Sequence, residues 1–387
     1  MIISPAQRTG DVREYYFSTK NREIAALNAD GRTEPVINLG IGSPDGTPPS
    51  AAIDALVENA RKDGVHGYQS YTGIPELRAA FASWYKRWYG VSLDPASEIQ
   101  PLTGSKEGIL ITSLAFLNKG DKVLVPDPGY PTYSSASRLC EATPVYYDLI
   151  EEKGWQPDLD ALEKTDLTGV KMMWTNYPNM PTGAPADHGL YERLVDFGRS
   201  HGILICNDNP YSFILTEEHH SILSVPGAKE VCLELNSLSK AHNMAGWRIG
   251  MVASSADVVK EILKVKSQLD SGMFRPLQLA AVEALAQGPE WFEKLNAEYR
   301  RRRVAAGRIF DLLGVSYNHD SQGLFLWGKV PEGQDPVAVS DRLLHEAGVF
   351  ITPGFVFGRN GRDRLRISLC APVERFERAY EKIKAVL

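Results

Sequence analysis

The sequence predicts an α/β protein whose main domain is a mostly parallel sheet covered by helices on both faces, with a smaller α+β domain beside it. Short apolar runs rich in β-branched residues alternate with helix-like segments along most of the chain, which is typical of successive β-α-β units. The chain has 387 residues, which is too many for one ordinary hydrophobic core, so two domains are expected.

The expected strands of the parallel sheet are short and apolar, as in sheets that are buried on both faces. They are Val123–Val125, Lys171–Thr175, Ile203–Cys206, Val231–Leu235 and Ile249–Ala253. Segments with the character of helices, such as Gly108–Leu117 and Gly189–Ser200, separate several of these strands. The order of strand, helix and strand therefore favours parallel pairing.

The last third of the chain has a different pattern. The segment Glu290–Leu313 has helical periodicity and is long enough to bridge two domains. The elements expected after it are a strand at Gly323–Val330, a helix at Pro336–Ala347, a strand at Arg364–Leu369 and a helix after Val373. We therefore expect a large domain at residues 46–288 and a small α+β domain that combines residues 1–45 with residues 289–387.

The composition argues against several classes of partner. The formal net charge of −6 argues against nucleic acid and anionic membrane surfaces, because both attract basic patches. The first residues lack the apolar core of a signal peptide, and no stretch approaches the ~18 apolar residues of a membrane helix, so a cytoplasmic protein is expected. The four cysteines and eight histidines show no metal-site spacing, so no metal is expected.

Polar turns follow four of the expected strands. Tyr130 lies in the first turn, residues 176–183 form the second, Asp208 and Tyr211 follow the third strand, and Lys240 follows the fourth. The carboxyl ends of parallel strands meet at one edge of an open sheet, which is where such sheets bind ligands. The sequence therefore predicts a binding site that brings an acid, tyrosines, hydroxyls and a lysine to one rim.

Two local features indicate what this site binds. The turn TGSKEG at residues 103–108 lies between a short strand and a helix, and free N–H groups at a helix start suit a phosphate, although Thr-Gly-Ser is equally a common helix cap. Neither the P-loop pattern nor G-x-G-x-x-G is present. Lys240 has apolar neighbours, and desolvation makes an amine nucleophilic toward an aldehyde; the alternative is an ordinary surface lysine.

The segment SLSKAHNMAGWRIG at residues 237–250 resembles the cofactor-lysine signature of the class I/II aminotransferases, which have fold type I of the pyridoxal-phosphate (PLP) enzymes. Seven further motifs occur in the order of that family: INLGIGSPD, YQSYTGIPELR, TGSKEGI, DPGYPTY, YPNMPTG, DNPY and LRISL. The resemblance covers nearly the whole chain. It implies PLP as the cofactor and a mostly parallel seven-stranded sheet sandwiched by helices.

The resemblance also implies a role for each residue around the cofactor ring. Lys240 forms the Schiff base with the cofactor aldehyde and then moves a proton between the substrate and the cofactor. Asp208 pairs with the ring nitrogen and keeps it protonated, Tyr211 donates to the phenolic oxygen, and Tyr130 stacks on the ring. Without the resemblance, Tyr130 would be interpreted as an ordinary packed aromatic residue.

Further residues are expected to hold the phosphate and the substrate. The phosphate set is Gly104, Ser105, Lys106 through its backbone, Ser237, Ser239 and Arg248. Tyr68 resembles a tyrosine that reaches the phosphate of the neighbouring subunit, which implies a homodimer with shared active sites. Gly42 resembles a backbone contact to the substrate, and Arg366 the arginine that binds its α-carboxylate through a bidentate pair, although alone it would be a surface ion pair. Tyr15 is expected to cover the substrate or to pack against the other subunit.

One position departs from the family pattern. The residue before Pro-Thr-Gly is usually an asparagine that donates to the phenolic oxygen, whereas Met180 stands here and cannot donate. Asn179 would replace that donor if the turn shifted by one residue. If nothing replaces it, we expect the pKa of the linkage between Lys240 and the cofactor to lie above the range usual for the family.

The function predicted from the resemblance is transfer of an amino group from an L-amino acid to a 2-oxo acid by a ping-pong mechanism. The alternative is a PLP-dependent lyase that catalyses C–S β-elimination or decarboxylation, because such enzymes share the same lysine, aspartate and arginine. The substrate is open. Arg275 lies in a loop that, in this family, one subunit brings near the site of the other, where it could meet a second carboxylate of the substrate; the alternative is an arginine that faces solvent.

Overall fold

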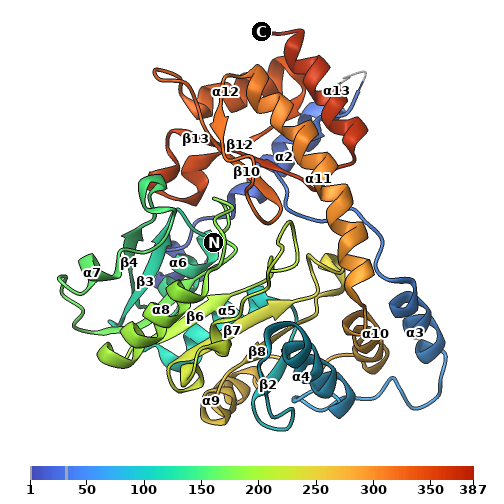
Figure 1. Ribbon diagram of the computed structural model, residues 1–387, viewed down its shortest axis with the longest axis vertical. Helices are drawn as coiled ribbons and strands as arrows, with labels where there is room; N and C mark the ends of the chain where they lie inside the picture. Colours follow the sequence, from blue (N-terminus) through green and yellow to red (C-terminus); the bar gives the residue numbers. More distant parts are fainter. Residues whose placement is uncertain (1, 31–33) are drawn as a thin grey trace.

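The central sheet contains seven strands, and the computed structural model describes residues 2–30 and 34–387 (Figure 1). The strands are β2 (Ile99–Leu102), β3 (Lys122–Asp127), β4 (Thr143–Asp148), β5 (Val170–Thr175), β6 (Leu204–Asp208), β7 (Cys232–Ser237) and β8 (Gly250–Ala253). They lie in the order β2-β8-β7-β6-β5-β3-β4, and β8 is antiparallel to both of its neighbours while the other pairs are parallel. The prediction of a mostly parallel seven-stranded sheet is confirmed.

Helices cover both faces of this sheet because both faces carry apolar side chains. The helices of this part of the chain are α3 (Ser50–Ala60), α4 (Pro75–Tyr89), α5 (Ser105–Phe116), α6 (Pro131–Leu139), α7 (Leu159–Leu162), α8 (His188–His201), α9 (Ala256–Lys266) and α10 (Arg275–Leu285), of which α3 packs on α10. In β3, Val123 and Val125 belong to the core cluster shared with α5, α6 and α9, whereas Leu124 belongs to the cluster shared with α4 and α8. Successive strand residues point to opposite faces, so a strand that is apolar throughout needs a helix on each side.

Two strands differ from expectation. The strand at 249–253 was expected to be one of the parallel strands, but β8 is antiparallel to β7. No crossover helix separates β7 from β8, and a parallel pair needs such a connection. Strand β4 was not expected, because Thr143–Asp148 is not an apolar run. It lies at the edge of the sheet, where only Tyr147 is buried.

The C-terminal part forms a second sheet. Helix α11 (Pro289–Leu312) runs from the central sheet to this part of the molecule (Figure 1). The sheet has the order β12-β13-β10-β9 and is antiparallel. Its elements are β9 (Ser316–Tyr317), β10 (Phe325–Lys329), α12 (Pro336–Arg342), a π-helical turn (Leu343–Ala347), β12 (Thr352–Pro353), β13 (Arg364–Ser368) and α13 (Val373–Lys384). The strands and helices expected in the last third of the chain are therefore present.

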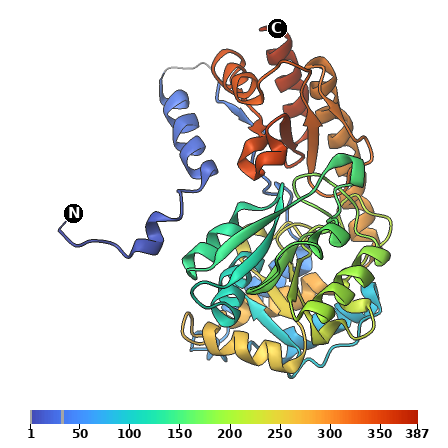
Figure 2. The same cartoon turned by 90° about the vertical axis from the view of Figure 1, so that its left-hand side faces the viewer.

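The N-terminal arm joins this C-terminal unit. It contains α1 (Gln7–Gly10), α2 (Tyr16–Ala29) and β1 (Ile37–Asn38), and β1 pairs in parallel with β11 (Val349–Phe350). Ile24 of α2 packs in a small core with Leu344 and Phe350, while the segment that carries α1 extends along the outside of the molecule (Figure 2). The domain limits 46–288, 1–45 and 289–387 remain a prediction. Within the described residues, no helix has both the length and the apolar character that a membrane crossing requires.

Candidate active site

A cavity of about 380 Å³ lies at the carboxyl edge of the central sheet. Its lining includes residues from all four polar turns: Tyr130 after β3, Asn176 and Met180 after β5, Asp208, Pro210 and Tyr211 at β6, and Ser237, Ser239 and Lys240 at β7. Helix α5, the small sheet and the N-terminal arm supply most of the other walls. The expected convergence of these turns on one rim is therefore seen in the fold.

Asp208, the last residue of β6, is 5% exposed. The Tyr133 hydroxyl donates a hydrogen bond of 3.0 Å to Oδ2, and no described residue bonds to the other oxygen, Oδ1. Burial raises the pKa of Asp208 to about 7, while the Tyr133 hydrogen bond and the positive charge of Lys240 oppose this rise. The carboxylate therefore has one open acceptor site, which a cationic N–H donor would satisfy.

Lys240 follows β7 and reaches across the cavity to the N-terminal segment. Its Nζ donates a hydrogen bond of 2.6 Å to the carbonyl oxygen of Gly42. Its neighbours Leu238, Ala241 and Met244 are buried, as the apolar sequence predicted. Burial lowers the pKa of the Lys240 ammonium, which makes the neutral, nucleophilic amine more readily available.

Groups that suit an anion gather where α5 begins. Ser105, its first residue, lines the cavity together with Ser237, Ser239 and Arg248. Gly104 has a φ of 78°, and a Cβ there would overlap the Arg248 guanidinium, so glycine allows the close approach. The Ser237 hydroxyl is buried and has no hydrogen-bond partner in the described chain. A helix N-terminus, a guanidinium and three serine hydroxyls together suit a phosphate group.

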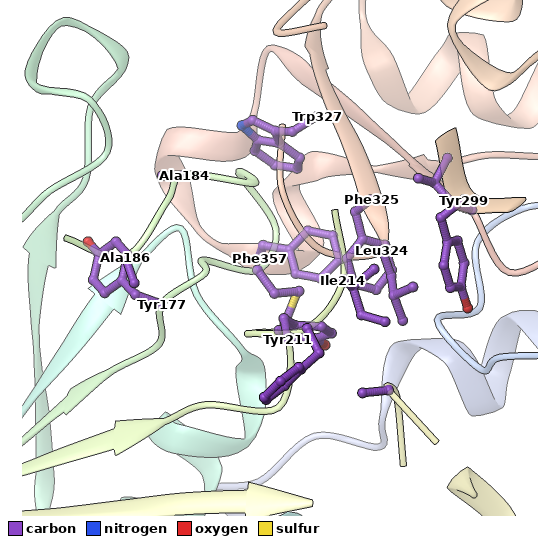
Figure 3. Packing of buried hydrophobic residues seen from close by; sticks show 14 of the residues in the cluster. Tyr177, Ala184, Ala186, Tyr211, Ile214, Tyr299, Leu324, Phe325, Trp327 and Phe357 are labelled. Carbon is purple, nitrogen blue, oxygen red and sulfur yellow. The ribbon is translucent and has the colours of Figure 1, made fainter. Parts of the chain in front are cut away.

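Arg366 of β13 forms the opposite wall and is 3% exposed. Its Nη2 donates to the carbonyl of Gly40 at 2.6 Å, its Nη1 to Met180 Sδ at 3.4 Å, and Nε has no partner among the described residues. Three aromatic rings surround Cζ, with their centres at 4.0 Å for Phe325, 4.4 Å for Phe357 and 5.4 Å for Phe17 (Figure 3 shows Phe325 and Phe357). Burial lowers the pKa of Arg366 to about 10, so this cation suits a ligand that brings a negative charge.

The remaining wall combines the start of α5 with the N-terminal arm. The Lys106 ammonium lies 4.5 Å from the ring centre of Tyr15 and 5.9 Å from that of Tyr130. Phe17 and Asn21 of α2 line the same side of the cavity. The arm of this chain therefore lines its own pocket, while the role of Tyr15 as a cover over the substrate stays a prediction.

The sequence profile of the family described as aminotransferase class I and II matches residues 34–383. The chain belongs to this family. Its aminotransferase chemistry and its fold, predicted from the sequence motifs, are thereby confirmed.

Relatives with full-length similarity carry the same enzyme class. The LL-diaminopimelate aminotransferase of Aquifex aeolicus is 42% identical over 351 residues, which cover 90% of this chain and 91% of the relative. That of Moorella thermoacetica is 38% identical over 387 residues, which cover 100% and 99%. The solved structure of substrate-bound BacF from Bacillus subtilis has a TM-score of 0.93 and 33% identity, and covers 100% of this chain and 98% of that one. The family and fold are PLP-dependent, and nothing in these similarities supports the lyase alternative.

This aminotransferase differs from the family pattern at Met180, and Asn179 does not enter the pocket. The Asn179 amide donates to the Asn176 carbonyl at 3.0 Å, and its Oδ1 accepts from the backbone and hydroxyl of Thr182. Both ends of the side chain are therefore used within the turn. Asn176, which lines the pocket, donates to the Asp208 carbonyl at 2.6 Å.

Three other residues considered from the sequence lie outside the cavity. Gly104 acts through the space that it leaves for Arg248. Tyr68 is 93% exposed. Arg275 begins α10, 3.6 Å from the Glu76 carboxylate, and does not line the pocket of its own chain.

Several pocket residues were not predicted. Tyr133 lies within the DPGYPTY motif and Asn176 directly precedes YPNMPTG. Their polar side chains in these turns could therefore have predicted a place in the pocket. Phe17, Phe325 and Phe357 gave no signal, because they are separate aromatic residues that meet only when α2, β10 and the 354–357 turn fold around Arg366.

Proposed function

We propose that this aminotransferase binds PLP in the cavity at the sheet rim and moves an amino group from an L-amino acid to a 2-oxo acid in a ping-pong cycle, with Lys240 bonded covalently to the cofactor. The observation that carries the proposal is the open acceptor site of the buried Asp208, which faces the same cavity as the Lys240 amine. A carboxylate in such a setting needs a cationic partner that no described side chain supplies through Oδ1.

The residues present fit PLP group by group. Asp208 would hold the protonated ring nitrogen, Tyr211 the phenolic oxygen, and Tyr130 the ring face. The phosphate would be held by Ser105, the Lys106 backbone, Ser237, Ser239 and Arg248. The unpartnered Ser237 hydroxyl and the space opened by Gly104 support this fit. When bound, the cofactor supplies an electron sink for the bond that breaks at the substrate Cα.

Lys240 is proposed to move the proton. Its Nζ is buried and its pKa is lowered, so a neutral amine is available to accept a proton from the substrate Cα. The hydrogen bond to the Gly42 carbonyl holds the amine at the cavity. Borohydride treatment of the coloured protein should fix the cofactor on the peptide that contains Lys240. A colourless protein with added PLP and an unmodified Lys240 would sink the proposal.

Arg366 is proposed to bind the α-carboxylate of the substrate. Arg366→Ala should remove two charged hydrogen bonds of ~1.5–3 kcal/mol each, or roughly 3–6 kcal/mol, which is a loss on the order of 10²–10⁴ in kcat/KM. Arg364→Ala is the matched control, because Arg364 is a buried arginine of the same strand whose guanidinium binds Glu151 outside the pocket. A loss below about tenfold for Arg366→Ala would reject the assignment.

The amino substrate is proposed to carry a second polar end, and LL-diaminopimelate is the first candidate because two full-length relatives are LL-diaminopimelate aminotransferases. Lys106 supports this choice, because no described carboxylate pairs with its ammonium, which lies on the arm side of the cavity. A panel of amino donors scored by the loss of visible absorbance tests it. Lys106→Gln should raise KM for donors with two carboxylates more than for alanine.

A homodimer with shared sites is proposed from one exposed face. Tyr68 is 93%, Tyr71 44% and Phe274 41% exposed. A Cβ on Gly272 would overlap the backbone of residues 69–70, so the two loops that carry these aromatic residues pack together. Exposed aromatic residues on such a surface are typical of a protein interface. Sedimentation of the purified protein tests the dimer, and Tyr68→Phe should weaken PLP binding if Tyr68 reaches the partner's phosphate site.

A further inference from the structure

Asp127 is a buried carboxylate for which the proposed chemistry has no role. It is the last residue of β3 and the first of the DPGYPTY motif. Its side chain is 2% exposed, yet it does not line the cavity that contains Tyr130, three residues later. Its side-chain partners lie far along the chain, in the small turn Arg359–Gly361 that precedes β13.

The contacts of Asp127 join the central sheet to the C-terminal unit. Oδ2 accepts a hydrogen bond of 3.0 Å from Arg359 Nε, and Oδ1 accepts one of 3.0 Å from the backbone N–H of Asn360. The Asp127 carbonyl accepts from Asn360 Nδ2 at 2.9 Å. The exposed Asp148 at the end of β4 accepts from the same two residues at 2.8 Å and 2.9 Å. The ends of two adjacent strands therefore hold one turn.

The backbone of that turn is held as closely as its side chains. The N–H of Gly129 donates to the carbonyl of Phe357 at 2.8 Å. Gly358 has a φ of 141°, and a Cβ there would overlap Asp127 Oδ1, so only glycine lets the carboxylate approach the chain this closely. Residues 357–360 are consequently fixed by residues 127–129.

The fixed segment ends in a wall of the substrate site. Phe357 is 4% exposed, and its ring centre lies 4.4 Å from Arg366 Cζ. Its ring also contacts the ring of Trp327, edge-on with the centres 5.8 Å apart (Figure 3), and the ring of Phe17, tilted with the centres 6.5 Å apart. A shift of the turn would therefore move an aromatic face away from the guanidinium.

We infer that Asp127 is a positioning residue that fixes Phe357 against Arg366 and thereby sets the affinity for the substrate carboxylate. The inference rests on the proposed function, because it takes Arg366 as the carboxylate-binding residue. Phe357 contacts the guanidinium and not the reacting atoms, so it supports Arg366 equally before and during the reaction. Such uniform support lowers KM and leaves kcat nearly unchanged.

The test compares Asp127→Asn with Asp148→Asn. Both changes remove one carboxylate from Arg359, but only the first removes the buried one. Asp127→Asn should raise KM for the amino donor and for the oxo acid by about tenfold, the value of one charge-assisted hydrogen bond, with kcat changed by less than about threefold. In the cofactor-free protein, amide hydrogen exchange of residues 354–361 should become faster. Asp148→Asn should change KM by less than about threefold.

Arg359→Gln is the second variant if Asp127→Asn folds poorly, because it removes the same ion pair from an exposed position. An unchanged KM with unchanged hydrogen exchange overturns the inference, and so does a fall in kcat at constant KM. Arg366→Ala distinguishes a failure of the proposed carboxylate-binding role of Arg366 from a failure of the positioning role of Asp127. If Arg366→Ala also leaves KM unchanged, the carboxylate assignment itself is wrong; if it raises KM and Asp127→Asn does not, only the positioning role is wrong.

Discussion

Two buried carboxylates on neighbouring strands differ in how many of their oxygen atoms have hydrogen-bond partners. Glu234 of β7 is 0% exposed and accepts four hydrogen bonds. The donors are the Tyr85 hydroxyl at 2.9 Å, the Ser221 hydroxyl at 2.8 Å, the Asn207 amide at 2.9 Å and the Ile222 N–H at 3.1 Å. Asp208 of β6 is also buried, but one of its oxygens has no described partner. Both oxygens of Glu234 therefore have partners within the described residues, whereas Asp208 leaves one oxygen open for the ligand proposed above.

Two buried arginines show the same contrast. Arg302 of α11 is 8% exposed, and its guanidinium binds the carboxylates of Asp45 and Glu298. Arg366 is 3% exposed and has aromatic rings, a thioether and one carbonyl around it, with no carboxylate among its described partners. A buried charge without a counter-charge is costly, so it persists where a function requires it. The incomplete charges, one negative and one positive, both face the same cavity.

The largest expected effect comes from removing the incomplete carboxylate. Asp208→Asn cannot hold a proton on the ring nitrogen by charge, so kcat/KM should fall by a factor on the order of 10²–10⁴. Steady-state kinetics with saturating PLP measure the loss. The cofactor-free protein should remain folded, because an amide at this position has no charge to bury. A variant that keeps full activity would show that Asp208 is as structural as Glu234.

The second effect is a pH dependence of stability in the cofactor-free protein. The pKa of Asp208 is about 7 in the folded protein against 3.8 for an ordinary aspartate, so the folded state retains a proton that the unfolded state has lost. The contribution of Asp208 to the free energy of unfolding is therefore fully present below about pH 4. It is lost as the pH rises to about 7, which lowers the free energy of unfolding by up to roughly 4 kcal/mol. Urea unfolding across this range measures it. Asp208→Asn should remove this part of the slope, and equal slopes in both proteins would contradict the prediction.

The third effect concerns the complete carboxylate. Glu234→Gln replaces one acceptor oxygen by an amide that faces donors, so the free energy of unfolding should fall by roughly 2–4 kcal/mol. The kcat of the folded fraction should change little, since Glu234 does not line the cavity. Tyr85→Phe is a milder variant that removes one of the four donors and should cost about 1 kcal/mol. A large loss of kcat with unchanged stability would contradict this prediction and would mean that Glu234, like Asp208, acts in the reaction.

The sequence predicts which charged residues lie at the pocket, but not which buried charged residues have all their hydrogen-bond partners within the protein. Asp208 and Lys240 could be predicted because apolar runs followed by polar turns are local signals, and parallel strands bring such turns to one rim. The partners that complete Glu234 come from positions as far as 149 residues away, so no local pattern shows that this acid is satisfied. Asp127 belongs to the DPGYPTY motif, but its partner Arg359 lies 232 positions away, so the motif alone does not predict the ion pair.

The same limit applies to the fold. Apolar strands predicted the sheet core, whereas the edge strand β4 has a mixed sequence because one of its sides has no neighbour to pack against. The aromatic surroundings of Arg366 join α2, β10 and the 354–357 turn, which are distant in sequence. Long-range packing, rather than local propensity, determines these features.

The smallest expected effect concerns Met180, whose thioether accepts a hydrogen bond from Arg366. Met180→Asn places an amide where the family usually has one, and a donor to the phenolic oxygen stabilises the form that has lost a proton. The pKa of the linkage between Lys240 and PLP should therefore fall by about one unit, the value of one hydrogen bond. A pH titration of the visible absorbance measures it. Asn179→Ala is the control and should leave this pKa unchanged, since both ends of the Asn179 side chain are bound within the turn. A shift with Asn179→Ala and none with Met180→Asn would mean that the missing donor had been restored from the adjacent position.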